Sequence, residues 1–252
     1  MDDLTKTAVF RAQVPNVRAL EAAIRHLRRS INLAMRKGDG PAERTHTLTL
    51  AVTYCAWLEA FFSKLIHTPF GLNIDEIRQI KAEQSSNGIT AAWHRCVSLA
   101  LQRVSSRGRS NYLPNIEQRL EKLVDEYVGA PSVLRNKIAH GQWSVALNRE
   151  NDAVNPEISK DLAALDVVTI DRWRLAVTKL AAVVEALIES PDRAFHRDYW
   201  VELSGLEEQL KETERWTRQS KVDKLTQKPV RPTPNMAPNS TGAGESALTP
   251  DR

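Results

Sequence analysis

The segment 133–141 combines three residue types that can do chemistry on a phosphodiester. Arg135 and His140 lie five positions apart, and Asn136 directly follows the arginine. An imidazole can take or give a proton near neutral pH. A planar guanidinium matches two phosphate oxygens, and an amide can donate a hydrogen bond to phosphate or orient the imidazole ring. We therefore predict that Arg135, Asn136 and His140 are catalytic residues.

A short helix is expected to support these side chains. Ser132 stands just before an apolar-periodic run and predicts the helix N-cap. Leu134 and Ile138 would anchor one face of the helix to a core, while the amide and the imidazole would lie on the nearly opposite, solvated face. Gly141 suits the left-handed residue that ends such a helix. The pattern predicts that guanidinium, amide and imidazole are presented together from a fixed support.

This segment resembles the signature of the HEPN superfamily, in which a histidine follows an arginine a few residues later, commonly with a polar residue after the arginine. Arg135 and His140 fit that spacing, Asn136 fills the polar position, and no other histidine of the chain has an arginine five to seven positions before it. The resemblance in helical layout covers about residues 17–190, but the residue-level match covers only 135–140. It implies an all-α, HEPN-like antiparallel helical bundle, often a metal-independent endoribonuclease, and a homodimer whose two motifs line one cleft.

RNA carries its own nucleophile, the 2′-hydroxyl. Cleavage needs a base for that proton, a cation for the charge on the phosphorus oxygens, and an acid for the leaving 5′-oxygen. Histidine and arginine can fill these roles without a metal, and the expected products are a 2′,3′-cyclic phosphate and a 5′-hydroxyl. Because one motif supplies one histidine, His140, a separate base and acid are most easily arranged in a two-fold homodimer with a composite site.

Glu59 stands inside a mostly apolar predicted helix, where a carboxylate needs a partner. HEPN-like domains often carry an acidic residue on this helix near the arginine. The resemblance therefore implies that Glu59 pairs with Arg135 and fixes its fork. A local pair with Lys64, or plain exposure to solvent, is an equally weighted alternative.

Three further basic residues are predicted to contact RNA. Lys137 lies within the motif, and Arg107 and Arg109 belong to a loop rich in Ser and Gly. Positive charge favours binding to a phosphate backbone, although an ordinary solvated surface is the alternative for such clusters. Trp143 could stack on a base of single-stranded RNA, but a tryptophan so close to a helix end favours core or hairpin packing.

The composition argues against several kinds of site. A net charge of +4 is compatible with an anionic partner without requiring one. Cys55 and Cys96 are isolated on apolar helical stripes, as expected for buried thiols of a cytoplasmic protein. His94 lies near Cys96, but no second pair completes a zinc site, and no Gly-rich phosphate loop is present, so we expect neither a metal nor a cofactor. The absence of a leader and of a long apolar run predicts no secretion signal and no membrane span.

Apolar periodicity and turn residues divide the chain into helices. The predicted helices, beyond the motif helix, cover 17–37, 41–67, 74–82, 93–104, 114–127, 170–188 and 194–225. Alternating residues at 143–147, followed by turn formers at 148–152, are consistent with a small β-hairpin. The predicted organisation is a helical domain at 1–193, a charged helical arm at 194–225, and a tail at 226–252 whose Pro, Ser and Gly content predicts disorder.

Three functions fit these observations. The first is a metal-independent endoribonuclease that acts as a toxin or phage-defence effector on RNA, with a cognate antitoxin or defence-system partner. The second is a catalytically inert HEPN-like module that binds nucleotide or protein. The third is a helical adaptor whose charged arm binds a partner. Retention of arginine, asparagine and histidine together favours the first.

Overall fold

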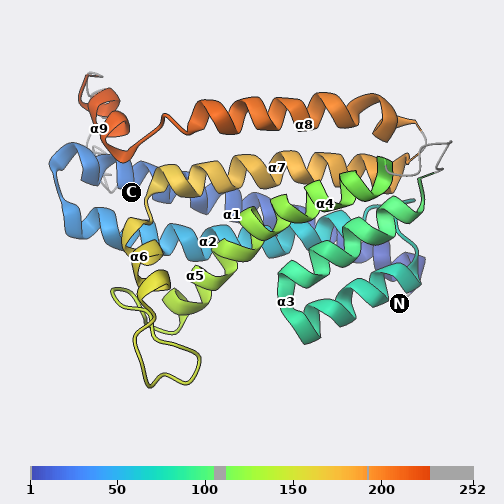
Figure 1. The fold of residues 1–252 in the computed structure, drawn as a ribbon, viewed down its shortest axis with the longest axis horizontal. Helices are drawn as coiled ribbons and strands as arrows, with labels where there is room; N and C mark the ends of the chain where they lie inside the picture. The colour runs from blue at the N-terminus through green and yellow to red at the C-terminus, as the bar shows by residue number, and fades with distance from the viewer. Residues whose placement is uncertain (1, 105–111, 192, 228–252) are drawn as a thin grey trace, which may run out of the picture.

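The computed structural model of the chain describes residues 2–104, 112–191 and 193–227. In these ranges the protein is built from helices (Figure 1). They are α1 (Asp3–Lys37), α2 (Gly40–Ile66), α3 (Ile74–Gln102), α4 (Tyr112–Val124), the π-helix η1 (Asp125–Gly129), α5 (Ala130–Ala139), α6 (Pro156–Ala164), α7 (Val167–Glu189), α8 (Ala194–Thr213) and α9 (Arg218–Gln227). The predicted all-α class is confirmed. Arg107 and Arg109, and the predicted tail from 228 onward, lie outside the described residues.

Helices α1 and α2 form a long antiparallel pair that turns at one end of the molecule (Figure 1). Gly38 ends α1 in the left-handed conformation, with φ of 66°, and Asp39 caps α2 by accepting a hydrogen bond from the amide of Ala42. The sequence periodicity marked α1 only from Val17, but the helix begins at Asp3 because the Asp2 side chain caps it. The pair supplies one side of the core.

Helix α7 lies against α2 and completes that core, and α8 runs alongside α7 on the outside (Figure 1). Aromatic side chains fill the centre. The rings of Tyr54 and Trp173 have centroids 5.8 Å apart, and those of Phe62 and Trp93 are 4.7 Å apart. This packing makes α2 the central support on which other helices are placed.

By length and composition, α2 is the one described helix that could cross a membrane. Half of its most apolar 18-residue stretch is buried inside the protein. The core helix of a soluble protein has the same character, so this feature is weak evidence for a membrane span.

The predicted break at 85–88 is confirmed, because the helix labelled α3 consists of two helical stretches joined by a sharp kink at Gly88. Gly88 has φ of 84° and ψ of −176°, and the chain is helical on both sides of it, from Ile74 to Gln102. Only a glycine adopts this backbone conformation without strain. The sequence pattern located this break correctly, but the second helical stretch begins directly after Gly88 rather than at the predicted position 93.

The predicted interruption before the motif, by contrast, is wrong. Gly129 is helical, with φ of −65° and ψ of −60°, and η1 passes directly into α5. Pro131 has no N–H to donate to the carbonyl oxygen of Tyr127 four residues earlier. The hydroxyl of Tyr54 donates to that oxygen instead, at 3.1 Å, and Tyr54 is fully buried. A side chain from α2 therefore replaces the hydrogen bond that Pro131 cannot make, and the helical backbone continues from η1 into α5.

The region after the motif contains no strand among the described residues. Leu147 and Val154 form a single antiparallel bridge, so the predicted β-hairpin is reduced to a short irregular loop, 141–155. This loop projects from one edge of the molecule below α5 and α6 (Figure 1). Helix α6 follows it, and the sequence periodicity did not indicate that helix.

The predicted arm is two helices rather than one. Helix α8 ends at Thr213, whose carbonyl and hydroxyl oxygens accept hydrogen bonds from the guanidinium of Arg172. Thr217 and Ser220 then exchange side-chain-to-backbone hydrogen bonds and start α9. The hydrogen bonds from Arg172 on α7 end α8, and the Thr217–Ser220 cap starts α9. The composition of the segment alone predicts a single continuous helix.

Candidate functional site

Helix α5 carries the motif and is held against α2 by polar contacts. Cys55 donates a hydrogen bond from its thiol to the carbonyl oxygen of Pro131, at 3.7 Å. One turn further along α5, the guanidinium of Arg135 donates to the carboxylate of Glu59 through Nη2. The predicted Glu59–Arg135 pair is confirmed. Leu134 is buried, as predicted for an anchor of this helix to the core.

The start of α5 differs from the sequence-based expectation. Ser132 lies inside the helix and donates from its hydroxyl to the carbonyl oxygen of Val128, at 2.7 Å, so it is not the N-cap. Serine returns this hydrogen bond to the preceding turn when the helix already exists upstream. The expectation of a free helix start was wrong because η1 supplies that upstream turn.

The end of α5 is as predicted. Gly141 has φ of 80°, and its amide donates to the carbonyl oxygen of Ile138, at 3.1 Å. The amide of Gln142 donates to the carbonyl oxygen of Lys137, at 2.9 Å. These two bonds form a Schellman motif, which places His140 at the C-cap. The imidazole is therefore carried by the last residue of a well-terminated helix.

The three predicted catalytic residues do not share one face of α5. Asn136 and His140 are exposed, and their side chains make no hydrogen bond with any described residue. Arg135 is a third exposed and turns toward α2 and Glu59 instead. The amide and imidazole are presented together as predicted, but the guanidinium is on the flank of the helix.

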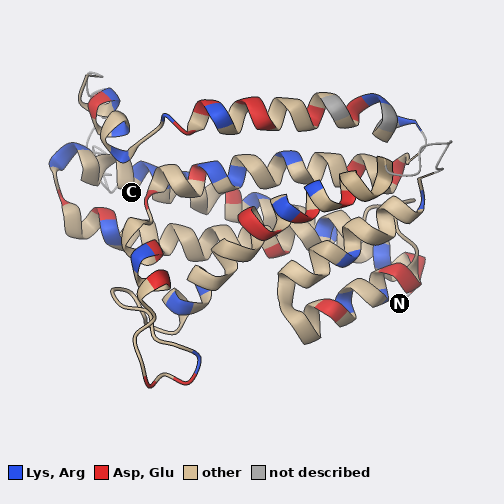
Figure 2. Cartoon of the chain, in the orientation of Figure 1, with Lys and Arg blue, Asp and Glu red and all other residues tan. Residues whose placement is uncertain are grey.

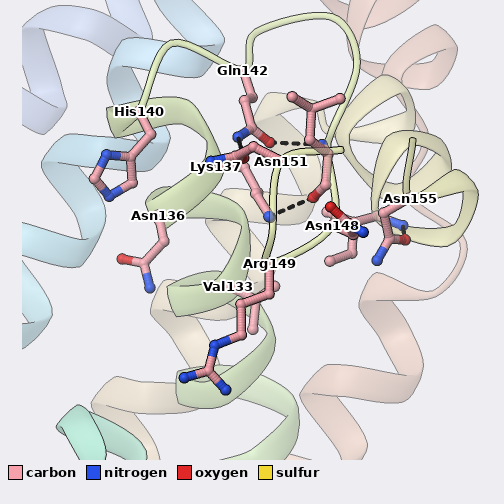
Figure 3. Close-up of a pocket in the computed structure, with 11 residues that line it drawn as sticks. Val133, Asn136, Lys137, His140, Gln142, Asn148, Arg149, Asn151 and Asn155 are labelled. Carbon is pink, nitrogen blue, oxygen red and sulfur yellow. Dashed lines mark hydrogen bonds between the residues drawn. The ribbon is translucent and has the colours of Figure 1, made fainter. Parts of the chain in front are cut away.

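An open pocket of about 800 Å³ lies beside Asn136 and His140 (Figure 3). It is formed by α5, the loop 141–155 and the start of α6. Its polar lining consists of Asn136, Lys137, His140, Gln142, Asn148, Arg149, Asn151 and Asn155, and its apolar lining of Val133, Leu147 and Ile158. Arg135 and Glu59 do not line it. The structure thus brings Lys137 together with two of the predicted catalytic residues.

Two side chains from the end of α5 fix the loop that forms the far wall. Lys137 donates from Nζ to the carbonyl oxygen of Leu147, at 2.6 Å, and Gln142 accepts through Oε1 from the amide of the same residue, at 2.8 Å (Figure 3). Both backbone groups of Leu147 are therefore held. One of the three ammonium donors of Lys137 is used in this way, so its predicted role toward RNA is shared with a structural one.

Asparagines shape the rest of the loop. Asn148 accepts through Oδ1 from the amide of Asp152, at 3.1 Å, and donates through Nδ2 to the Asp152 carboxylate, at 2.6 Å. Asn151 has φ of 58°, in the left-handed region that asparagine tolerates. Asn155 caps α6 by accepting from the amide of Ile158, at 3.0 Å. The sequence pattern indicated turn formers here but not that they would enclose a pocket.

Arg44 and Trp143 secure the loop from the other side. The guanidinium of Arg44 on α2 donates to the carbonyl oxygens of Trp143, Leu162 and Leu165, at 3.2, 2.9 and 3.4 Å. Burial lowers the pKa of Arg44. The indole of Trp143 donates to the carbonyl oxygen of Ile138, at 3.0 Å, and the residue as a whole is 42 % exposed. Its packing at the helix end is confirmed, and its stacking on a base stays a prediction.

Two histidines outside the motif lie close to oxygen atoms of other residues. His94 on α3 lies with Nε2 3.0 Å from the carboxylate of Asp125, a close approach that is not aligned as a hydrogen bond. His67 is buried, with Nδ1 2.6 Å from the carbonyl oxygen of Ser63. Burial lowers the pKa of His67. The His94 contact joins α3 to η1, whereas the His67 contact is made within one turn at the end of α2.

The cysteines are buried thiols, as predicted. Burial raises the pKa of Cys96 to about 12, and burial also raises the pKa of Cys55 to about 12, against the partly offsetting charge of Arg135. Within the described residues, no group of three or more His, Cys, Asp or Glu side chains is arranged to hold a metal ion.

Charged residues of both signs are interspersed along the helices in the view of Figure 2.

Comparison of the chain with protein-family models, with curated proteins and with solved structures gives no match.

Proposed function

We propose that this protein is a cytoplasmic, metal-independent endoribonuclease of HEPN type, acting as a toxin or a phage-defence effector. The observation that supports it best is the arrangement on α5. His140 and Asn136 are exposed side by side beside a pocket, and Arg135, also from α5, is held by an ion pair with Glu59 on α2. This arrangement offers a proton-transfer group and donors for phosphate oxygens without a carboxylate in the pocket lining.

The chemistry begins with attack of the RNA 2′-hydroxyl on the adjacent phosphorus. One imidazole accepts the hydroxyl proton, and the bond from phosphorus to the 5′-oxygen breaks as that oxygen receives a proton from an acid. Asn136 donates to a phosphorus oxygen. Arg135 uses one N–H group toward Glu59 and retains others for the developing negative charge.

A homodimer would supply the second imidazole. In a two-fold assembly each chain contributes the same patch, so the His140 of one protomer can act as base while the equivalent group of its partner acts as acid. A cognate antitoxin would act by covering this patch.

The Glu59–Arg135 pair also favours the second candidate, an inert binding module. In that case Arg135 serves to fasten α5 to α2 and has no contact with substrate. The two functions predict different effects of removing the imidazole. Because His140 is exposed and its side chain holds no other described residue, its loss should abolish cleavage in a nuclease but change nothing in an inert module.

The deciding experiment is cleavage of mixed RNA by the purified full chain in excess chelator. We expect wild-type protein to produce 2′,3′-cyclic phosphate ends, and His140→Ala to cut at least about a hundredfold more slowly at unchanged melting temperature. His26→Ala, at an exposed position on α1, is the matched control. Undiminished cleavage by pure His140→Ala, or activity that returns only with added Mg²⁺, would contradict the proposal.

A further inference from the structure

The pocket beside His140 has the character of an anion site. Lys137 and Arg149 bring permanent positive charge to its lining, and the amides bring N–H donors. No carboxylate lines it, because the acidic residues of the loop, Glu150 and Asp152, do not contribute to the wall. A concave surface with this charge favours a negatively charged ligand over a cation.

The pocket is built before any ligand arrives. Its far wall is fixed to α5 through Leu147 and to α6 through Asn155, whose Oδ1 caps that helix. Capping uses only the side-chain oxygen of Asn155, so the N–H groups of its side-chain Nδ2 have no partner among the described residues. A preformed wall with unused donors lowers the ordering cost of binding.

Arg149 is the feature that the fold itself does not explain. It is exposed at the pocket wall and forms no ion pair or hydrogen bond with any described residue. Other arginines have clear structural partners, as Arg218 has in Glu43 and Arg28 has in Asp171. Figure 3 shows the Arg149 guanidinium on the same side of the pocket as Val133 and Asn136.

The apolar part of the lining suggests what accompanies the anion. Val133, Leu147 and Ile158 form a hydrophobic wall within the same pocket. Its volume of about 800 Å³ lies in the range of small-ligand sites and accommodates a nucleotide unit rather than a duplex. A base must leave its stack to reach such a concave wall, which favours a single strand.

We propose that this pocket binds a nucleotide of single-stranded RNA next to the cleaved bond, with Arg149 contacting its phosphodiester and Val133 contacting its base. The identity of the polymer rests on the proposed nuclease function, whereas the anionic, single-stranded character follows from the pocket. Asn136 and His140 at the rim then face the neighbouring phosphodiester of the same strand.

Binding can be tested without catalysis. The probe is a fluorescein-labelled single-stranded oligoribonucleotide of mixed sequence with every 2′-hydroxyl methylated, so that no attack on phosphorus occurs. Fluorescence anisotropy with the full chain measures Kd over a series of salt concentrations. For Arg149→Ala we expect about a tenfold rise in Kd and a fall of about 0.7 in the slope of log K against log salt, as for one lost phosphate contact.

Two controls isolate the pocket from general charge. Arg18→Ala removes the same charge from an exposed position of α1 outside the pocket, and should change Kd less than twofold. Val133→Glu places a carboxylate at a half-exposed position of the wall and should weaken binding about tenfold, whereas Val133→Gln should weaken it far less. Melting temperatures of all variants should match wild type.

Each outcome decides the proposal. Equal Kd for Arg149→Ala, Val133→Glu and Arg18→Ala, or no binding of the probe by wild type, would overturn it. A changed sedimentation coefficient of the pocket variants with unchanged Kd would show a protein interface instead. Equally strong competition by inorganic phosphate would show a site for free phosphate. Arg149-dependent binding without cleavage of unmodified RNA would support the pocket while contradicting only the nuclease function.

Discussion

The carboxylate of Glu59 on α2 accepts a hydrogen bond from the guanidinium of Arg135 on α5. These residues are far apart in the sequence, and the contact settles the orientation of the motif arginine. It turns Arg135 away from the pocket that Asn136 and His140 line. Any contact of Arg135 with substrate is therefore made from this braced position.

Glu59→Gln should reduce RNA cleavage much more than stability. Both partners are about a third exposed or more, so the loss in free energy of unfolding should not exceed about 1 kcal/mol. If Arg135 contacts the substrate as proposed, the displaced guanidinium should lower kcat between about 10- and 100-fold, because small errors in the position of such a group are costly.

Asp75→Asn is the matched control for Glu59→Gln, since it breaks the exposed Asp75–Arg78 pair on α3. It should leave both cleavage and stability nearly unchanged. Wild-type cleavage rates in Glu59→Gln would show that the ion pair does not position the arginine.

Gly141→Ala should destabilise the protein by about 1–2 kcal/mol in urea denaturation, because φ of 80° is unfavourable for a residue with a Cβ atom. No heavy atom lies within 4 Å of the added Cβ, so the cost is conformational rather than steric. Gly205→Ala within α8 also meets no close atom and should instead stabilise by roughly 0.5–1 kcal/mol. Equal effects of the two substitutions would contradict the left-handed C-cap.

Cys55 and Cys96 should be unreactive toward a thiol reagent at pH 8 in the native protein. Burial raises the pKa of each to about 12, which leaves a thiolate fraction on the order of 10⁻⁴ at that pH. Both thiols should react when the chain is unfolded in denaturant. Native labelling at the unfolded rate would show that these side chains are accessible.

The same shifts predict a loss of stability in alkali. An unfolded thiol has a pKa near 8.5, so stability from the protonated buried thiols is fully present below about pH 8.5. It falls as pH rises toward the folded pKa of about 12. Replacement of Cys96 by Ala should reduce this alkaline slope, measured by urea denaturation across that pH range. An unchanged slope would contradict the assignment.

Mixing wild-type chains with excess His140→Ala chains should suppress RNA cleavage if the active unit is a homodimer with a composite site. Most wild-type chains would then sit in heterodimers that hold one imidazole. Activity of wild type alone should also fall on dilution below the dimer dissociation constant. A linear mixing curve, or a cleaving monomer in light scattering, would rule out the two-histidine mechanism and require a different acid.

Local sequence determined much of this protein. Apolar periodicity placed the main helices, and Gly38 and Gly141 marked two helix ends, because a left-handed cap depends on one residue and its immediate neighbours. Periodicity also placed Leu134 and Ile138 in the core. Asn136 and His140 could be assigned to a common exposed face for the same reason, since residues four apart on a helix lie together.

Tertiary structure alone decided the rest. Pro131 reads as a helix breaker until the hydroxyl of Tyr54 satisfies the carbonyl oxygen that the proline leaves free. From the sequence, Arg149 is an ordinary loop residue. Its place in the pocket lining depends on the hydrogen bonds by which Lys137 and Gln142 hold that loop against α5. In each case the deciding hydrogen bond joins segments that no local propensity connects, and its free energy depends on burial and geometry that exist only after the helices have packed.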